Sequence, residues 1–199
     1  MGITGDLFNQ DTLAFDVVDK NMPLAARMRP RDMTQFYGQE HLLGVDKELL
    51  RIINTDCFTS LIFYGPPGTG KTTLSHLIVR KTQRTFIAVS AVTSNVQEIR
   101  RIIDDASRKS RLGIKTALFV DEIHRFNKAQ QDLLLPHIEK GTISFIGATT
   151  HNPFFSCIAP LVSRSQVFRL KALKSEAIIK ILKRALVDVT HGLGKYKVL

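Results

Sequence analysis

Long apolar runs are missing from this sequence. Its longest ones, such as residues 61–64 and 117–120, are far shorter than the roughly 18 residues that a membrane-spanning helix needs. We therefore expect no membrane-spanning segment and no membrane partner. Cysteine is also scarce, because only Cys57 and Cys157 are present, far apart and without a second cysteine or a histidine at ligand spacing. This pattern predicts neither a disulfide framework nor a zinc site.

Acidic residues are outnumbered by basic ones. The 199 residues include 28 lysines and arginines against 18 aspartates and glutamates, so the net charge is +10. The excess lies mainly in residues 61–110 and 151–199 and favours a partner that carries phosphate groups, although charge alone indicates nucleic acid only weakly. Residues 1–6 contain no basic residue and no apolar run, so we expect a cytoplasmic protein, free or associated with the nucleoid.

Short segments rich in β-branched and aromatic residues recur along the chain and predict five strands. They cover residues 60–64, 85–90, 116–120, 143–148 and 166–170. Helical patterns lie between them; Ser94 and Gln97, for example, resemble a capping box ahead of apolar residues at helical spacing. Strands that alternate with helices predict an α/β fold, with a five-stranded, mainly parallel sheet flanked by helices. A last helix, which Ser175 would cap, is followed by no further strand.

A glycine-rich loop follows the first predicted strand. The phosphate-loop pattern fits, position for position, Gly65, Pro66, Pro67, Gly68, Thr69, Gly70, Lys71 and Thr72. In such a loop, glycines permit a tight turn, and backbone N–H groups and the next helix N-terminus face phosphate oxygens. Lys71 adds a positive charge and Thr72 a hydroxyl for Mg²⁺. A Gly-Pro turn formed by chance is the alternative, but the strand, the loop, the Lys-Thr pair and the helical run coincide here.

Two carboxylates, Asp121 and Glu122, end the third predicted strand. Most Asp-Glu pairs are solvated strand ends, but a phosphate loop upstream favours a catalytic interpretation. Asp121 would hold Mg²⁺ through water, and Glu122 would orient and deprotonate the attacking water. The strand at residues 85–90 either separates the two sites in the sheet or flanks them, an arrangement that suits ATPases with a catalytic glutamate.

Hydroxyl and guanidinium groups lie in the segment that connects the fourth predicted strand to the fifth. Thr149 and Thr150 end one strand, and either hydroxyl could contact a γ-phosphate or its attacking water; solvated strand-end threonines are the alternative. Ser163 and Arg164 stand at the end of a short predicted helix, and arginine neutralises transferring phosphate in a forked geometry. Alone, Arg164 would be an ordinary surface arginine.

Taken together, these residues resemble the AAA+ ATPases, P-loop NTPases with a helical lid. The motifs resemble those of one branch in particular, the replication-associated recombination protein A family, which is related to clamp loaders and to the Werner-helicase-interacting protein. The resemblance covers almost all of residues 22–199. It rests on MPLAARMRP (22–30), YGQEHLL (37–43), GPPGTGKTTL (65–74), SAVTSNVQEIR (90–100), LFVDEIHRFNKAQQDLLLPHIEKGTISFIGATT (118–150) and SRSQVF (163–168).

The resemblance assigns roles to several positions. It implies that residues 65–72 with Thr73 bind ATP and Mg²⁺, and that Tyr37 and Gly38 lie near the adenine. It casts Asp121 and Glu122 as the metal carboxylate and the base, Thr150 as the γ-phosphate sensor, and Arg164 as a finger that reaches a neighbouring subunit's ATP. A finger of that kind requires a homo-oligomer. A further hypothesis is that Ser90 holds Glu122 in an inactive rotamer until DNA binds.

The resemblance also implies a domain organisation: an N-terminal arm at residues 1–22, an ATPase core at 23–171 and the start of a helical lid at 172–199. The sequence departs from the family at His151, where an acidic residue is usual, and at residues 158–160. It also stops where the family continues through the lid, whose second sensor arginine is missing, and through a C-terminal assembly region. We therefore expect a C-terminally truncated member.

The functional expectation is an ATP-dependent, DNA-binding ATPase that acts in replication-fork maintenance, DNA repair and recombination. Its DNA would be forked, gapped or partly single-stranded, and replication proteins are further expected partners. The alternative is a truncated nucleotide-binding remnant without turnover that associates with a full-length relative. A Holliday-junction branch-migration motor shares the phosphate loop and the threonines at residues 149–150, but the HRFNKAQQD run at 124–132 argues against it.

Overall fold

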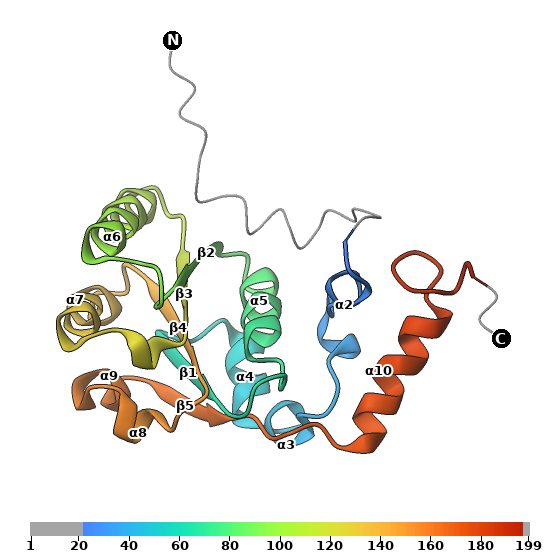
Figure 1. Cartoon of the computed structure of the whole chain (residues 1–199). Helices are drawn as coiled ribbons and strands as arrows, with labels where there is room; N and C mark the ends of the chain where they lie inside the picture. Colours follow the sequence, from blue (N-terminus) through green and yellow to red (C-terminus); the bar gives the residue numbers. More distant parts are fainter. Residues whose placement is uncertain (1–21, 197–199) are drawn as a thin grey trace, which may run out of the picture.

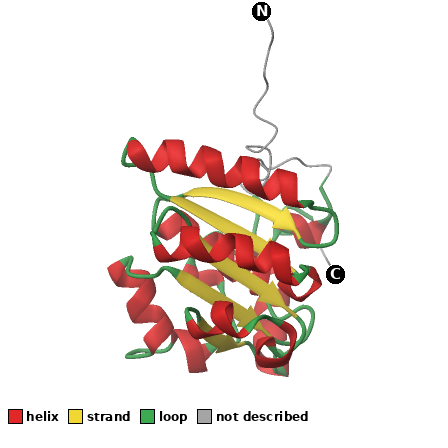
Figure 2. Ribbon diagram, turned by 90° about the vertical axis from the view of Figure 1, so that its left-hand side faces the viewer, coloured by secondary structure: helices red, strands yellow, loops and turns green. Residues whose placement is uncertain are grey.

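The computed structural model describes residues 22–196, so the predicted N-terminal arm lies outside the described residues except for Met22. A central sheet with helices on both faces forms the body of the molecule (Figures 1 and 2). Its strands are β1 (Ser60–Tyr64), β2 (Thr85–Ser90), β3 (Thr116–Asp121), β4 (Ser144–Thr149) and β5 (Gln166–Arg169).

The five strands are parallel and stand in the order β2-β3-β4-β1-β5. The predicted α/β fold with a five-stranded sheet is therefore confirmed. The strand at residues 85–90 is β2, which flanks β3 at the edge of the sheet, and β4 is the strand that separates β1 from β3. Because the strands are parallel, the segments that follow β1, β4 and β3 emerge side by side at one edge, where open parallel sheets bind ligands.

Helices connect the strands and cover both faces of the sheet. They are α2 (Leu24–Arg27), η1 (Met33–Gln35), α3 (Glu40–Leu43), α4 (Glu48–Thr55), α5 (Lys71–Lys81), α6 (Val96–Arg111), η2 (Ile123–Arg125), α7 (Lys128–Glu139), α8 (Pro153–Ser156), α9 (Ala159–Ser163) and α10 (Ser175–Val187). In residues 22–196, none of them combines the length and apolar composition that crossing a membrane requires.

Alternation along the strands divides the core in two. In β1, Ile62 faces a cluster formed with α6 and α7, whereas Leu61 and Phe63 face a second cluster formed with α4 and α5. Successive side chains of a strand point to opposite faces, and both faces here are covered. The result is a sheet buried on both sides, which fixes the strand ends that carry the candidate site.

Two helix starts differ from the sequence prediction. The side chain of Asn95, not Ser94, caps α6 by accepting a hydrogen bond from the Glu98 N–H at 2.9 Å. α10 begins at Ser175 itself, and its N-cap is Lys174, whose side chain makes no capping hydrogen bond. Ser94 and Ser175 were plausible caps because several polar residues lie next to the start of each helix. The local sequence pattern does not select one of them.

α10 lies beside α2 and the segment that follows it (Figure 1). Arg184 of α10 donates hydrogen bonds to the carbonyl of Met28 and to the backbone and side-chain oxygens of Gln35. Other side chains of α10 are less covered: Ile178, Ile179, Leu182 and Leu186 are exposed. The division of the chain into a core at residues 23–171 and a lid from 172 stays a prediction.

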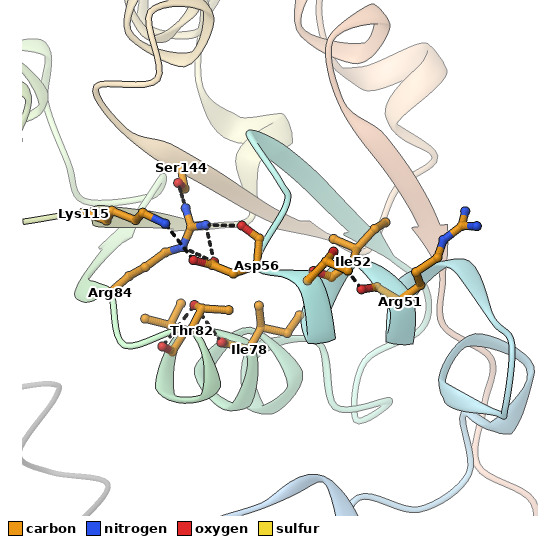
Figure 3. A network of polar contacts seen from close by, with 10 residues as sticks. Arg51, Ile52, Asp56, Ile78, Thr82, Arg84, Lys115 and Ser144 are labelled. Atoms are coloured by element: carbon orange, nitrogen blue, oxygen red, sulfur yellow. Dashed lines mark hydrogen bonds and ion pairs between the residues drawn. The ribbon is translucent and has the colours of Figure 1, made fainter.

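A buried arginine joins three elements at the sheet edge opposite the phosphate loop (Figure 3). Arg84 pairs with Asp56 after α4, donates to Ser144 of β4, and lies 4.2 Å from the centre of the Phe58 ring. Lys115 binds the second carboxylate oxygen of Asp56 at 2.8 Å. Burial alone would raise the pKa of Asp56, but hydrogen bonds from Lys115 and Arg84 outweigh it and hold the pKa below its ordinary value.

Replacing Arg84 with methionine should destabilise the fold by about 3 kcal/mol, because it leaves Ser144 and part of the Asp56 carboxylate without partners. Thermal unfolding followed by circular dichroism should show a midpoint about 10 °C lower. Lys115→Met is the matched control: Lys115 is exposed, so about 1 kcal/mol or less is expected. Equal losses in both variants would contradict the assignment.

The contribution of the Asp56 pair should also depend on pH. Because the pKa of Asp56 is lowered in the folded state, its charge stabilises the fold fully at pH values above the ordinary aspartate pKa, and this contribution is lost as the pH falls through the lowered pKa. The difference in stability between the wild type and Arg84→Met should therefore shrink in acid.

Candidate active site

The phosphate loop connects β1 to α5, and two of its glycines are required by the space around them. Gly65 has a φ of 153°, and a Cβ there would lie 2.2 Å from the carbonyl oxygen of Leu170. Gly70 has a φ of 95°, and a Cβ there would lie 2.8 Å from the Phe36 ring. The loop is therefore held between the end of β5 and the N-terminal segment. This fixes the direction in which its backbone N–H groups and α5 point.

Lys71 is the first residue of α5, and its side chain is buried in the loop. Its ammonium donates hydrogen bonds to the carbonyls of Gly65 at 2.9 Å and Pro66 at 3.0 Å. Burial lowers the pKa of Lys71, and the nearby negative charges of Glu122 and Asp121 oppose that shift. The ammonium therefore lies between the loop and the two carboxylates, where incoming phosphate oxygens can replace the carbonyls as its partners.

The donors around this loop suit Mg²⁺ bound together with phosphates. Thr72 stands in the first turn of α5, and Asp121 ends β3. Residues 22–196 hold no group of three or more histidine, cysteine or acidic side chains that could cage a metal. Mg²⁺ is commonly held by one or two carboxylates, waters and substrate phosphates, so a hydroxyl and one carboxylate fit it. Burial raises the pKa of Asp121, partly offset by a hydrogen bond from the Glu122 N–H.

Glu122 adopts an uncommon backbone conformation directly after β3. Its φ of 53° and ψ of 46° lie in the left-handed region, which costs a residue other than glycine about 1–3 kcal/mol. Its Oε2 oxygen lies 3.1 Å from His124 Nδ1 and 3.4 Å from both the N–H and the hydroxyl of Thr150. The strained turn therefore aims the carboxylate at the end of β4, beside the phosphate loop.

The two threonines at the end of β4 have different surroundings. Thr149 is fully buried, its hydroxyl accepts a hydrogen bond from the His151 N–H at 3.0 Å, and it lies 2.9 Å from His124 Nδ1. Thr150 is half-buried and contacts Glu122. The sequence could not decide between them; the geometry favours Thr150 as the residue that faces the reacting groups.

The hypothesis that Ser90 holds Glu122 does not match the structure. Ser90 pairs with Asp121 in the β2–β3 register, and its hydroxyl accepts from the Val92 N–H at 3.3 Å. The carboxylate of Glu122 instead accepts hydrogen bonds from Thr150, and its Oε2 lies 3.1 Å from His124 Nδ1. In the β2–β3 pairing, Ser90 lies opposite Asp121, the residue before Glu122. The left-handed turn at Glu122 directs its carboxylate toward β4 rather than β2.

A cavity of about 260 Å³ adjoins the phosphate loop on the side of α10, and its lining supports the expected adenine position. Tyr37 lines it together with Gly68 of the loop, Thr73 of α5, Leu173 and Ile181 of α10. Gly38, the other predicted residue, lines a neighbouring cavity of about 300 Å³. Tyr37 therefore stands at the candidate base pocket, and Gly38 lies next to it.

Gln39 is a site residue that the sequence did not single out. It is buried; its Nε2 donates to the carbonyls of Thr69 at 3.3 Å and Lys171 at 2.8 Å, and its Oε1 accepts from the Lys171 N–H at 3.0 Å. The side chain thus links the phosphate loop to the connection between β5 and α10. In the sequence, the only indication that Gln39 belongs to the site was its place in the YGQEHLL run. No sequence pattern reveals the contact between residues 39 and 171.

Arg164 is the one predicted catalytic residue that lies away from this cluster. It precedes β5, which runs parallel to β1, so it stands at the opposite edge of the sheet from the phosphate loop. It pairs with Glu139 and donates to the carbonyl of Pro160 at 3.0 Å. Within one chain it therefore does not reach the site.

Comparison with known proteins decides the family. The model of the ATPase family associated with various cellular activities (AAA) matches residues 61–173, which include the phosphate loop, Asp121, Glu122 and Thr150. The chain belongs to the AAA family. Its sequence is 51% identical to replication-associated recombination protein A of Escherichia coli strain K12 over 183 residues, and 46% identical to ATPase WRNIP1 of Dictyostelium discoideum over 164 residues.

These matches cover most of this chain but a smaller part of the relatives. They span 92% of the chain and 41% of the E. coli protein, and 82% of the chain and 19% of the Dictyostelium protein. Among solved structures, the Thermotoga maritima RuvB Holliday junction branch migration motor superimposes with a TM-score of 0.63 at 29% identity, over 80% of this chain and 54% of that one. The AAA fold is thus shared with RuvB, while the higher identity is to the recombination protein.

Proposed function

We propose that this AAA protein binds ATP with Mg²⁺ and hydrolyses it to ADP and phosphate. The observation that carries the proposal is the convergence of Lys71, Asp121, Glu122 and Thr150 at the ends of three adjacent strands. Buried titratable groups with displaced pKa values, here Lys71 and Asp121, are typical of functional sites. The family match and the name of the Dictyostelium relative, ATPase WRNIP1, support the same chemistry.

Each residue has a role that its position allows. The backbone N–H groups of residues 65–72 and the Lys71 ammonium hold the phosphates. Thr72 and Asp121 would hold Mg²⁺, which would offset the negative charge of the phosphates. Glu122 accepts a proton from the attacking water. Thr150 donates its hydroxyl toward the γ-phosphate or that water. Tyr37 borders the adenine.

We propose that Arg164 acts on the ATP of a neighbouring subunit in a homo-oligomer, since it stands at the far edge of its own sheet. Guanidinium groups neutralise the transferring phosphate when they reach it across an interface. Glu139 holds Arg164 at the surface, and this contact would exchange for phosphate on assembly.

We further propose a DNA partner and a role in replication-fork maintenance, repair and recombination, in the cytoplasm, free or associated with the nucleoid. The net charge of +10 supports contact with a phosphate backbone. Helix α6 contributes Arg100, Arg101, Arg108 and Arg111, all of them exposed. The name of the E. coli relative, replication-associated recombination protein A, supports a role in replication and recombination.

Steady-state hydrolysis of ATP, measured with and without forked or gapped DNA, tests this function. We expect DNA to raise the rate at low salt and the effect to fall as salt increases, because phosphate contacts release counterions. Arg164→Ala should abolish the stimulated rate while ATP still binds. A rate that DNA does not alter would contradict the DNA partner, and binding without any hydrolysis would indicate a nucleotide-binding remnant.

A further inference from the structure

Two donors and an imidazole nitrogen surround one oxygen of the Glu122 carboxylate. Oε2 receives the N–H and the hydroxyl of Thr150, each at 3.4 Å, and faces His124 Nδ1 at 3.1 Å. Among residues 22–196, no hydrogen bond reaches Oε1. A carboxylate held through one oxygen in this way has its other oxygen available to accept a proton. The shortest of the three contacts is the one to His124.

His124 Nδ1 has a second neighbour, the hydroxyl of Thr149, at 2.9 Å. The Thr149 hydroxyl can donate to Nδ1 or accept from it, whereas the carboxylate of Glu122 can only accept. With a proton on Nδ1, both oxygens can serve as its acceptor; with Nδ1 unprotonated, its lone pair faces the carboxylate. Thr149 is fully buried and already accepts from the His151 N–H. A charged acceptor forms the stronger hydrogen bond, so Glu122 selects the tautomer with the proton on Nδ1.

The charged and titratable groups around His124 are Glu122, His151 and Arg125. The His151 ring lies beside the His124 ring, with centroids 4.1 Å apart. Burial lowers the pKa of His124, His151 and Arg125 lower it further, and Glu122 opposes them. The imidazole is therefore neutral at neutral pH. A neutral donor can orient the carboxylate without forming the ion pair that would weaken it as a base.

We propose that His124 is the positioning residue of Glu122: its Nδ1–H fixes Oε2 beside Thr150 so that Oε1 faces the attacking water. This inference rests on the proposed function, because it assigns Glu122 as the base of ATP hydrolysis. It goes beyond that function by naming the side chain that orients the base, and by making the orientation depend on one tautomer of one imidazole.

Two substitutions at residue 124 separate orientation from packing. His124→Phe keeps a ring against His151 but has no donor, and should lower kcat about 10- to 100-fold with KM for ATP within twofold, the size expected for one hydrogen bond to a charged group. His124→Asn places an amide near the Nδ1 position and should restore kcat to within about threefold of wild type. Circular dichroism checks the fold of both variants. Equal losses in the two variants would overturn the proposal.

The pH profile of kcat provides a readout that packing alone would not move. Protonated His124 pairs with Glu122 and removes its capacity as a base. Because burial lowers the pKa of His124, wild-type kcat should fall at a pH below the ordinary histidine value. His124→Asn should lack this limb. His151→Glu replaces a neighbour that lowers the pKa of His124 by one that raises it, and should move the limb to higher pH, whereas His151→Gln should move it less. An unchanged limb in His124→Asn would refute the assignment.

Nitrogen NMR of the imidazole distinguishes failure of this inference from failure of the proposed function. We expect the His124 proton on Nδ1 in the wild type and on Nε2 in Glu122→Gln, where the carboxylate charge is gone. A wild-type proton on Nε2 overturns the inference whatever the ATPase activity. Absence of Glu122-dependent hydrolysis, with the proton on Nδ1, instead overturns the proposed function and with it the catalytic meaning of the contact.

Discussion

ATP binds about 10- to 100-fold more weakly to a Lys71→Met variant than to the wild-type chain, if the site acts as proposed. The Lys71 side chain is buried, and within residues 22–196 its ammonium donates only to the carbonyls of Gly65 and Pro66, so phosphate oxygens are better partners for it. Hydrogen bonds to charged groups contribute about 1.5–3 kcal/mol, which gives this loss of affinity. Methionine keeps the apolar stem and the approximate length of the side chain, so the fold should survive.

Equilibrium titration with a fluorescent ATP analogue measures the effect. Lys81→Met, at the other end of α5, is the control: Lys81 is exposed and bonds Asn54 at 2.6 Å. That variant should bind ATP as the wild type does. Equal affinity of Lys71→Met and wild type would show that the phosphates bind elsewhere.

Glu122→Gln should lower the hydrolysis rate about 10²- to 10⁴-fold, the range typical of losing a general base, with ATP affinity nearly unchanged. Glutamine preserves the shape of the side chain and can keep the contact with Thr150, but it does not accept the water's proton. Phosphate release under saturating ATP gives the rate. Glu48→Gln, an exposed glutamate on α4, is the matched control and should hydrolyse normally. Loss of binding along with hydrolysis would point to a structural role for Glu122 instead.

The sequence predicted this fold well where local chemistry determines structure. The phosphate loop has a strict residue pattern, and five apolar segments separated by helical patterns admit few arrangements other than a parallel sheet. The order of the strands was not predictable, because the placement of β4 between β1 and β3 depends on packing across the whole sheet. The hypothesis that Ser90 holds Glu122 came from the resemblance, and the left-handed turn at Glu122 that directs the carboxylate toward β4 has no signal in the sequence.

Some residues of the candidate site could be predicted from the sequence, and others could not. Lys71, Asp121 and Glu122 belong to short patterns whose spacing implies their chemistry, and the structure brings them together. Gln39 and His124 act through contacts with Lys171 and Thr149, which are distant in sequence, so their contributions follow only from the folded chain. Thr149 and Thr150 are alike in sequence and differ only in the direction in which each side chain leaves β4.

Single-turnover hydrolysis tests the central claim most directly. Excess wild-type chain is mixed with labelled ATP, Mg²⁺ and forked DNA, beside the Lys71→Met and Glu122→Gln variants, and bound and cleaved nucleotide are measured separately. The site described here predicts that the wild type binds and cleaves ATP, Glu122→Gln retains it uncleaved, and Lys71→Met binds little. Cleavage at the same rate in wild type and Glu122→Gln, or binding by the wild type with no cleavage, would contradict it.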